Sequence, residues 1–173
     1  MRVLASLSAI QGCGGLRAPI NAAALLFLVC PAIASEPIIG QASVIDGDTI
    51  EIHGTRIRLE GIDAPESGQR CIGKASGAEI RCGQRAAFFL ADMIGRHVVS
   101  CMESGKDRYK RTLARCEVGG QDVGAAMVKS GWAMAYVRYS SEYIPQEAEA
   151  RTAELGIWAT EFVPPWDWRR GAR

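Results

Sequence analysis

The chain has 173 residues, enough for one domain of ordinary size with a buried core. Hydrophobic residues make up 48% of the sequence, which excludes an intrinsically disordered protein. The formal net charge is only +1, so the broad positive field of a protein that binds nucleic acid by charge alone is absent.

The first 34 residues have the pattern of a secretory signal. They contain Arg2 and Arg17 but no acidic residue, and an apolar run covers residues 22–30. Ala32-Ile33-Ala34 then matches a small-x-small cleavage site. The run is short for a membrane span, although a retained anchor stays an alternative. We therefore expect export to the periplasm or the medium. Without Arg2 and Arg17 the 20 basic residues fall to 18 against 19 acidic ones, a charge of −1.

The mature chain opens with three short strands, predicted over Pro37–Ile45, Asp48–Ile52 and Thr55–Leu59. With His53-Gly54 as the turn, Asp48 pairs with Leu59 and continues the apolar row of Ile50. An unpaired carboxylate on a core face is costly, so Asp48 needs a compensating charge. Asp46 lies one step further along the same row.

The remaining elements are placed by periodicity and by Gly and Pro signals. A loop rich in Gly, Ser and Cys covers Ile62–Gly83. We predict three helices, over Gln84–Ile94, over a short segment that starts at Val123 and ends before Gly131, and over Pro145–Leu155. Three further strands are predicted over His97–Cys101, Thr112–Val118 and Trp132–Val137. Residues 161–173 form an aromatic, basic tail. A helix between the third and fourth strands fits a five-stranded OB-type Greek-key β-barrel with about three helices, an α+β domain over residues 35–160.

Four cysteines remain after the signal: Cys71, Cys82, Cys101 and Cys116. An even number in an exported chain indicates two disulfides, with three possible connectivities. A Cys71–Cys82 bond would close a loop, and a Cys101–Cys116 bond would join two neighbouring strands. No C-x-x-C pair is present, which disfavours a zinc site.

Asp46, Asp48, Asp63 and Glu66 are the candidate metal ligands. A cluster of oxygen donors suits a hard cation such as Ca²⁺. The spacing does not fit an EF-hand loop, so a site here would be assembled from strand ends. The alternative is turn formation, since Asp-Gly is a common turn pair.

Arg58, Arg108 and Arg111 are candidate phosphate ligands, with Tyr109 beside the last two. The planar guanidinium matches phosphate, although a single arginine is more often a surface charge. Simple pairing puts Arg58 opposite Thr49, on the face away from Asp48. A bulge, strand coiling or the reach of the side chain is needed to bring the two together.

Five stretches occur in an order and spacing that resembles the staphylococcal nuclease family. They are "VIDGDTIEI", "IRLEGIDAPE", "DRYKR", "GWAMAYV" and "LGIW", and the likeness covers about Ala42 to Ala159. The resemblance implies an OB barrel with three helices. It also implies a calcium-dependent nuclease that acts on DNA and RNA and leaves 3′-phosphate and 5′-hydroxyl ends, with no stable protein partner and a monomeric state.

The resemblance also assigns roles to single residues. Asp48 and Asp63 match calcium-binding carboxylates, and Thr49 matches the position whose main-chain carbonyl joins them. The other matches are Arg58 and Arg111 as phosphate-contacting arginines, Glu66 as the general base, and Tyr109 and Tyr136 as nucleotide-contacting tyrosines.

This sequence departs from the family pattern at three positions. Lys110 replaces a glycine before Arg111, and a lysine is strained there if the position has a positive φ. Arg138 replaces a tyrosine, which is expected to alter nucleotide contacts, and Ala64 replaces a threonine with little expected effect. The four cysteines are a further difference from the best-known member.

Two other interpretations stay open at this point. An OB barrel can hold single-stranded nucleic acid without cutting it, as a binding module of the cell envelope. The tail with Trp166 and Trp168 can also serve an envelope interaction, although a strap packed on the domain is the simpler interpretation.

Overall fold

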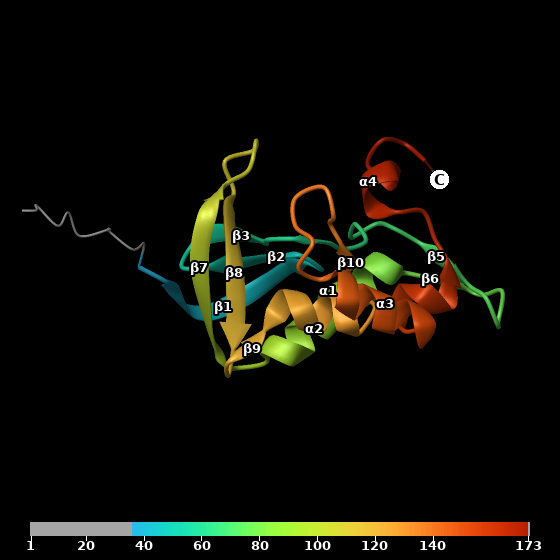
Figure 1. The fold of residues 1–173 in the computed structure, drawn as a ribbon, viewed down its shortest axis with the longest axis horizontal. Coiled ribbons are helices and arrows are strands. Elements are labelled where there is room, and N and C mark those ends of the chain that lie inside the picture. Colours follow the sequence, from blue (N-terminus) through green and yellow to red (C-terminus); the bar gives the residue numbers. More distant parts are fainter. Residues whose placement is uncertain (1–35, 173) are drawn as a thin grey trace, which may run out of the picture. The chain divides into compact units, whose positions relative to one another are not determined.

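A computed structural model describes residues 36–172; the predicted signal segment lies outside them. Five strands form a barrel: β1 (Ile38–Asp46), β2 (Thr49–Ile52), β3 (Thr55–Leu59), β7 (Val98–Lys106) and β8 (Thr112–Val118). Antiparallel pairing runs in the order β3-β2-β1-β7-β8, and a parallel β3–β8 pairing closes the sheet (Figure 1). The expected five-stranded α+β barrel is therefore confirmed. The two-residue strand β9 (Gln121–Asp122) pairs antiparallel with the end of β8.

The hairpin of β2 and β3 has the predicted register. Ile52 pairs with Thr55, and the turn between them has positive φ at both His53 and Gly54. A turn of this kind matches the twist of the two strands, so no bulge interrupts the pairing. The core lies inside the barrel and is continuous with the helices; its largest members include Ile50, Ile52, Ile57, Leu59, Leu90 and Met127.

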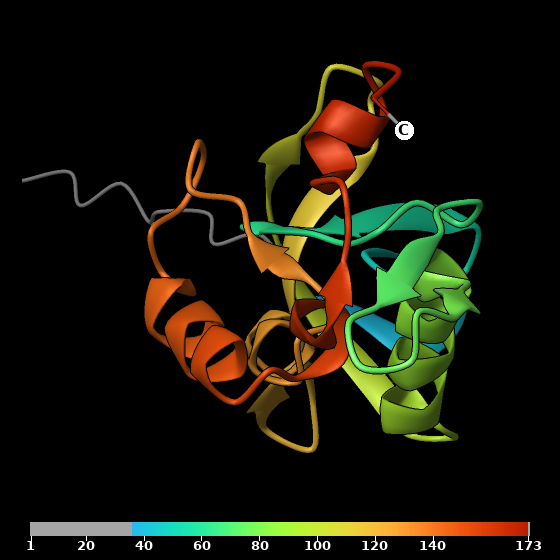
Figure 2. The same cartoon turned by 90° about the vertical axis from the view of Figure 1, so that its right-hand side faces the viewer.

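Three main helices accompany the barrel: α1 (Cys82–Ile94), α2 (Val123–Lys129) and α3 (Ile144–Thr152). In α1 the buried positions Ala86, Leu90 and Ile94 repeat at helical spacing and join the barrel core. Asp122 caps α2 by accepting a hydrogen bond from the Ala125 N–H. Figure 2 shows α1 (green) and α3 (orange) on opposite sides of the domain.

Two of the predicted segments differ in the structure. The predicted strand Trp132–Val137 is reduced to β10 (Met134–Ala135), which pairs with β4 (Ile62–Asp63) outside the barrel sheet. The loop predicted over Ile62–Gly83 contains not only β4 but also β5 (Cys71–Gly73) and β6 (Glu79–Ile80). These strands are two or three residues long, too short to produce a visible alternation.

The strand predicted over His97–Cys101 is also longer in the structure than expected. Strand β7 continues to Lys106 through an irregularity between Glu103 and Gly105, and a five-residue connection leads to β8.

Both proposed disulfides are present, Cys71–Cys82 and Cys101–Cys116, and the second joins β7 to β8 at directly paired positions.

The tail packs on the domain as a strap. Strand β11 (Thr160–Glu161) pairs with β5, and the short helix α4 (Pro165–Trp168) follows. Phe162 and Trp166 pack against a small buried cluster formed by Cys71, Cys82, Met134 and Ile157. Ile157 belongs to the one-turn 3₁₀ helix η1 (Gly156–Ala159). Within residues 36–172, no helix is long and apolar enough to cross a membrane.

Candidate nuclease site

Asp48 lies in the turn that joins β1 to β2. The β1–β2 register shifts between Val44 and Asp46, and the Asp48 N–H donates to Asp46 Oδ1 at 3.1 Å. A Cβ on Gly47 would lie 2.7 Å from the Ala64 side chain, so only glycine lets this turn approach so closely. The turn therefore presses Asp48 against the start of the segment that follows β4.

The Asp48 carboxylate is almost fully buried, with 3% of the residue exposed, and its oxygens have several donors. Oδ2 accepts the Ala64 N–H at 3.0 Å. Oδ1 accepts the Thr49 hydroxyl at 3.0 Å and Arg58 Nη1 at 2.6 Å. The charge that seemed costly on an apolar row is thus offset by an arginine and by hydrogen bonds.

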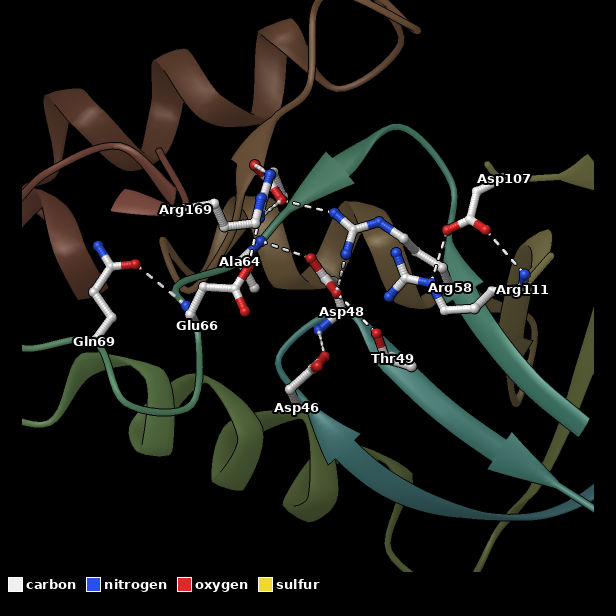
Figure 3. A network of polar contacts seen from close by, with 11 residues as sticks. Asp46, Asp48, Thr49, Arg58, Ala64, Glu66, Gln69, Asp107, Arg111 and Arg169 are labelled. Atoms are coloured by element: carbon white, nitrogen blue, oxygen red, sulfur yellow. Dashed lines mark hydrogen bonds and ion pairs between the residues drawn. The ribbon is translucent and has the colours of Figure 1, made fainter. Parts of the chain in front are cut away.

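Arg58 reaches Asp48 although the two residues start on opposite faces. Its pairing with Thr49 is as predicted, and the Leu59 N–H donates to Asp48 O at 2.9 Å, so the reach of the long side chain brings the two groups together. The guanidinium bends over the strand end, toward Asp48 (Figure 3). Its Nη2 donates to Asp63 Oδ1 at 2.7 Å, so Arg58 bridges two carboxylates. Burial works against its charge, but Asp48 and Asp63 raise the pKa of Arg58 overall.

Asp63 lies on β4, whose pairing with Met134 fixes its backbone, and it is completely buried. Besides Arg58 it accepts two hydrogen bonds from Arg169, at 2.9 Å to Oδ1 and 2.7 Å to Oδ2. Burial raises the pKa of Asp63, and the nearby Asp48 adds to this, against the opposing effect of the arginines. The carboxylates therefore crowd one another and depend on cations for their charge.

Glu66 completes the cluster from the loop after β4. Its side chain is 31% exposed, and Oε1 accepts Arg169 Nη1 at 2.6 Å. Its N–H donates to the buried side chain of Gln69, and Gln69 Nε2 donates to Val163 O at 2.6 Å. Gln69 thus ties the loop to the strap, and Glu66 faces the cluster with one side open to solvent.

Asp46 lies at the edge of the cluster. Burial, together with the negative charge of Asp48, raises the pKa of Asp46 to about 6. Its observed contact is the hydrogen bond from the Asp48 N–H, so it shapes the turn that carries Asp48.

Arg111 stands at the end of the β7–β8 connection. Thr112, the next residue, pairs with Ile57 of β3, which brings Arg111 to the strand that carries Arg58. The side chain extends toward Arg58 in Figure 3. Its Nε donates to Asp107 Oδ2 at 2.7 Å, and its N–H donates to Asp107 Oδ1 at 2.9 Å. Asp107 therefore holds both the backbone and the side chain of Arg111.

Lys110 has the positive φ that the sequence comparison anticipated, at 64°. Its N–H donates to Asp107 O, and the Tyr109 N–H donates to Asp107 Oδ1. These bonds close the turn despite the unfavourable backbone conformation of a lysine. The substitution strains the turn, and Arg111 still projects from its end.

The two tyrosines have different surroundings. Tyr109 is 65% exposed, and the guanidiniums of Arg108 and Arg111 lie 4.7 and 5.7 Å from its ring centre. The ring of Tyr136 lies parallel to Trp166 of α4, with ring centres 5.8 Å apart and an interplanar angle of 4°. Tyr136 follows β10, and its N–H donates to Gly61 O at 2.8 Å, just before β4.

Comparison with known proteins decides the family. The model of the staphylococcal nuclease homologues matches residues 56–160. This chain belongs to the staphylococcal nuclease family.

Relatives from several bacteria carry different names. The succinoglycan biosynthesis protein ExoI of Rhizobium meliloti (strain 1021) is 40% identical over 141 residues, 80% of this chain and 73% of that protein. The micrococcal nuclease of Shigella flexneri is 36% identical over 148 residues, 75% of this chain and 79% of that protein. An uncharacterized endonuclease of Haemophilus influenzae is 33% identical over 135 residues, covering 73% and 70% of the two chains.

Staphylococcal nuclease relatives typically depend on Ca²⁺, and the donor chemistry of this cluster fits such a cation. The carboxylates of Asp48 and Asp63 are buried, close to each other and compensated by guanidiniums, which a hard cation can replace. Among residues 36–172, no group of three or more His, Cys, Asp or Glu side chains converges as a ready metal site. Further oxygen ligands, such as a main-chain carbonyl and water, would have to complete the coordination.

The structure brings Asp48, Thr49, Arg58, Asp63 and Glu66 into one cluster. Arg111 borders it from the β7–β8 connection, and Tyr109 lies beside Arg111. Sequence reasoning missed Arg169 and Asp107. Asp107 has a local signal, an acidic residue four positions before Arg111. Arg169 has none, because it lies 106 residues from Asp63 in the chain.

Proposed function

We propose that this chain is an exported, calcium-dependent nuclease that hydrolyses phosphodiester bonds of DNA and RNA. One observation supports this most strongly. Two buried carboxylates, a partly exposed glutamate and the guanidinium of Arg58 meet at one edge of the barrel, and Arg111 borders them. A module that only binds nucleic acid has no use for so many buried carboxylates, because they repel phosphate.

Arg58 and Arg111 are the proposed phosphate ligands. A guanidinium can donate two parallel hydrogen bonds to phosphate oxygens, and it stays charged throughout the reaction. Arg58 is held by Asp48 and Asp63, and Arg111 by Asp107, so both are oriented before substrate arrives. Donors that are fixed in advance favour the transition state, in which negative charge accumulates on the phosphoryl oxygens.

Glu66 is the proposed general base. Its side chain has access to solvent and lies next to the buried carboxylates, where it can orient a water molecule and accept its proton. Attack by that water breaks the P–O5′ bond, so that the phosphate stays on the 3′ side and the 5′ oxygen leaves as a hydroxyl.

Asp48, Asp63 and the main-chain carbonyl of Thr49 are the proposed calcium ligands. When bound, Ca²⁺ supplies positive charge that stabilises the transition state. Tyr109 and Tyr136 are the proposed contacts to the nucleotide, since an aromatic ring can stack on any base.

Export of a monomeric enzyme is part of the proposal. The two disulfides support an oxidising compartment, and the signal-like pattern of residues 1–34 supports secretion with cleavage near Ala34. The domain would then comprise residues 35–160, followed by the tail 161–173.

The products of cleavage test the proposal. The purified protein is incubated with end-labelled DNA and RNA oligonucleotides in the presence of Ca²⁺, and the fragments are analysed before and after treatment with a 3′-phosphatase. We expect both substrates to be cut and every new 3′ end to carry phosphate. Fragments with 5′-phosphate would contradict the proposed chemistry. Binding without cleavage in any divalent cation would instead favour the envelope binding module.

A further inference from the structure

The tail places a positive charge directly on the candidate calcium ligands. One guanidinium, that of Arg169, contacts both oxygens of Asp63 and one oxygen of Glu66, at 2.6 to 2.9 Å. These carboxylates come from β4 and the loop that follows it, over a hundred residues earlier in the chain. Figure 3 shows Arg169 beside Glu66, on the opposite side of Asp48 from Arg111. With this contact in place, both oxygens of Asp63 accept hydrogen bonds from guanidinium nitrogens, and a metal ion has to compete with them.

The same short segment also covers the aromatic surface of the site. Trp166 lies parallel to the ring of Tyr136, three residues before Arg169. A base that stacks on this face of Tyr136 would have to displace the indole. One helical turn thus occupies two proposed binding surfaces at once, one for the cation and one for a base.

The attachment of the tail suggests where it can open. Residues up to Val163 are tied to the domain by the β11–β5 pairing and by the hydrogen bond from Gln69 to Val163 O. After that point, α4 is a single turn, and the Arg169 side chain is 33% exposed. Its partner Asp63 is completely buried, so the guanidinium can leave only when another cation takes over the charge of that carboxylate. Trp166 also packs against the cluster of Cys71, Cys82, Met134 and Ile157, so the segment after Val163 can lift from the site only when α4 leaves that cluster, while the β11–β5 pairing keeps the strap in place.

We propose that residues 164–169 form an intramolecular latch, which competes with calcium for Asp63 and Glu66 and with a nucleotide base for Tyr136. This proposal rests on the proposed function, because it concerns the same site. Calcium and Arg169 then bind Asp63 in mutually exclusive states. If the latch is closed in about nine molecules of ten, the apparent dissociation constant for calcium is about tenfold weaker than that of the open protein.

Three variants separate the latch from a simple effect of charge. Trp166→Ala weakens the docking of α4 without changing the charge, and Arg169→Gln removes the guanidinium. Arg170→Gln is the matched control, because it removes the same charge one residue further on from a side chain that is 69% exposed and pairs with Asp167. Circular dichroism checks that each variant is folded.

Calcium binding without nucleic acid is measured by isothermal titration calorimetry. We expect Trp166→Ala and Arg169→Gln to bind calcium about tenfold more tightly than the wild type, and Arg170→Gln to stay within twofold of it. In the wild type, hydrogen–deuterium exchange of the amides of residues 166–172 is expected to speed up when calcium is added.

Dissociation constants within twofold of the wild type for both Trp166→Ala and Arg169→Gln would overturn the latch, as would calcium-independent exchange of the segment. In that case the wild type still binds calcium and cuts nucleic acid, so the proposed function stands. If the wild type and all variants neither bind calcium nor cut, the proposed function fails, and the latch fails with it.

Discussion

Glu66 differs from the aspartates beside it in its exposure. Asp48 and Asp63 are buried and accept several hydrogen bonds each, which suits residues that hold a cation. Glu66 keeps 31% of its side chain exposed and contacts Arg169. Neighbouring carboxylates in different surroundings can have different roles, and the exposed one is the better candidate to handle water.

Glu66→Gln tests this role. The amide keeps the shape and can still accept a hydrogen bond, but it cannot take a proton. We expect the hydrolysis rate to fall at least about 100-fold while the free energy of unfolding changes by less than about 1 kcal/mol. Rates come from plasmid cleavage and stability from urea denaturation. Glu149→Gln, at a largely exposed position on α3, is the control and should cut like the wild type. A Glu66→Gln variant with wild-type rate would remove Glu66 from the mechanism.

Asp107 predicts a pH dependence at the β7–β8 turn. Burial alone would raise its pKa, but hydrogen bonds from Arg111 and from the Tyr109 N–H outweigh it, so the pKa of Asp107 is lowered. A carboxyl group with a lowered pKa contributes stability above its unfolded value of about 3.9, and this is lost as the pH falls through the folded value. The turn should therefore stay intact at neutral and mildly acidic pH.

Carboxyl NMR titration checks this directly. Asp107 is expected to titrate below about 3.9 in the wild type and closer to that value in Arg111→Lys, which lacks the Nε–H donor. An Asp107 pKa that is unchanged by Arg111→Lys would show that the two side chains do not interact in solution.

At the scale of elements, short connections position the site while regular strands supply its frame. The sequence predicts the barrel strands well, because alternation and the His53-Gly54 turn fix the register of β2 and β3. It does not predict how Arg58 meets Asp48, because Asp48 lies in a turn whose direction depends on the approach of Gly47 to Ala64. Strands β4 and β10 have two residues each, so tertiary pairing rather than local pattern creates them.

The strain at Lys110 can be measured by comparing two substitutions. Lys110 has φ of 64°, a conformation that costs a residue with a Cβ about 1 kcal/mol relative to glycine. We expect Lys110→Gly to be more stable than Lys110→Ala by about 1 kcal/mol in urea denaturation, with both retaining hydrolysis. Equal stability of the two variants would show that the turn relaxes to another conformation in solution.

The first turn of α1 has a strict requirement at Gly83. A Cβ there would lie 1.8 Å from the Glu66 carbonyl oxygen, so Gly83→Ala must displace the loop that carries Glu66. We expect a loss of about 1–3 kcal/mol in stability together with a large loss of hydrolysis. Gly105→Ala is the control, since its Cβ would meet nothing within 4 Å, and it should stay within about 0.5 kcal/mol. Wild-type stability and activity of Gly83→Ala would contradict the observed packing.

At the scale of the whole domain, the site joins segments that are far apart in the chain. Most residues of the candidate site were predicted from the motifs between residues 46 and 66 and from the turn before Thr112, because each of these segments contains its own turn or spacing signal. Arg169 comes from the tail, where composition indicated a packed strap but gave no reason to connect it with Asp63. Only the course of the chain through β11 and past Gln69 brings Arg169 to the carboxylates.

The initial rate of plasmid hydrolysis as a function of free calcium tests the central claim most directly. The account predicts a rate that rises with calcium to a plateau, vanishes in EGTA, and returns when calcium is restored, since the proposed ligands Asp48 and Asp63 would hold the cation that stabilises charge on the phosphoryl oxygens. Hydrolysis that is equally fast in EGTA would contradict the calcium site. Nucleic-acid binding with no hydrolysis at any calcium concentration would contradict the assignment as a nuclease.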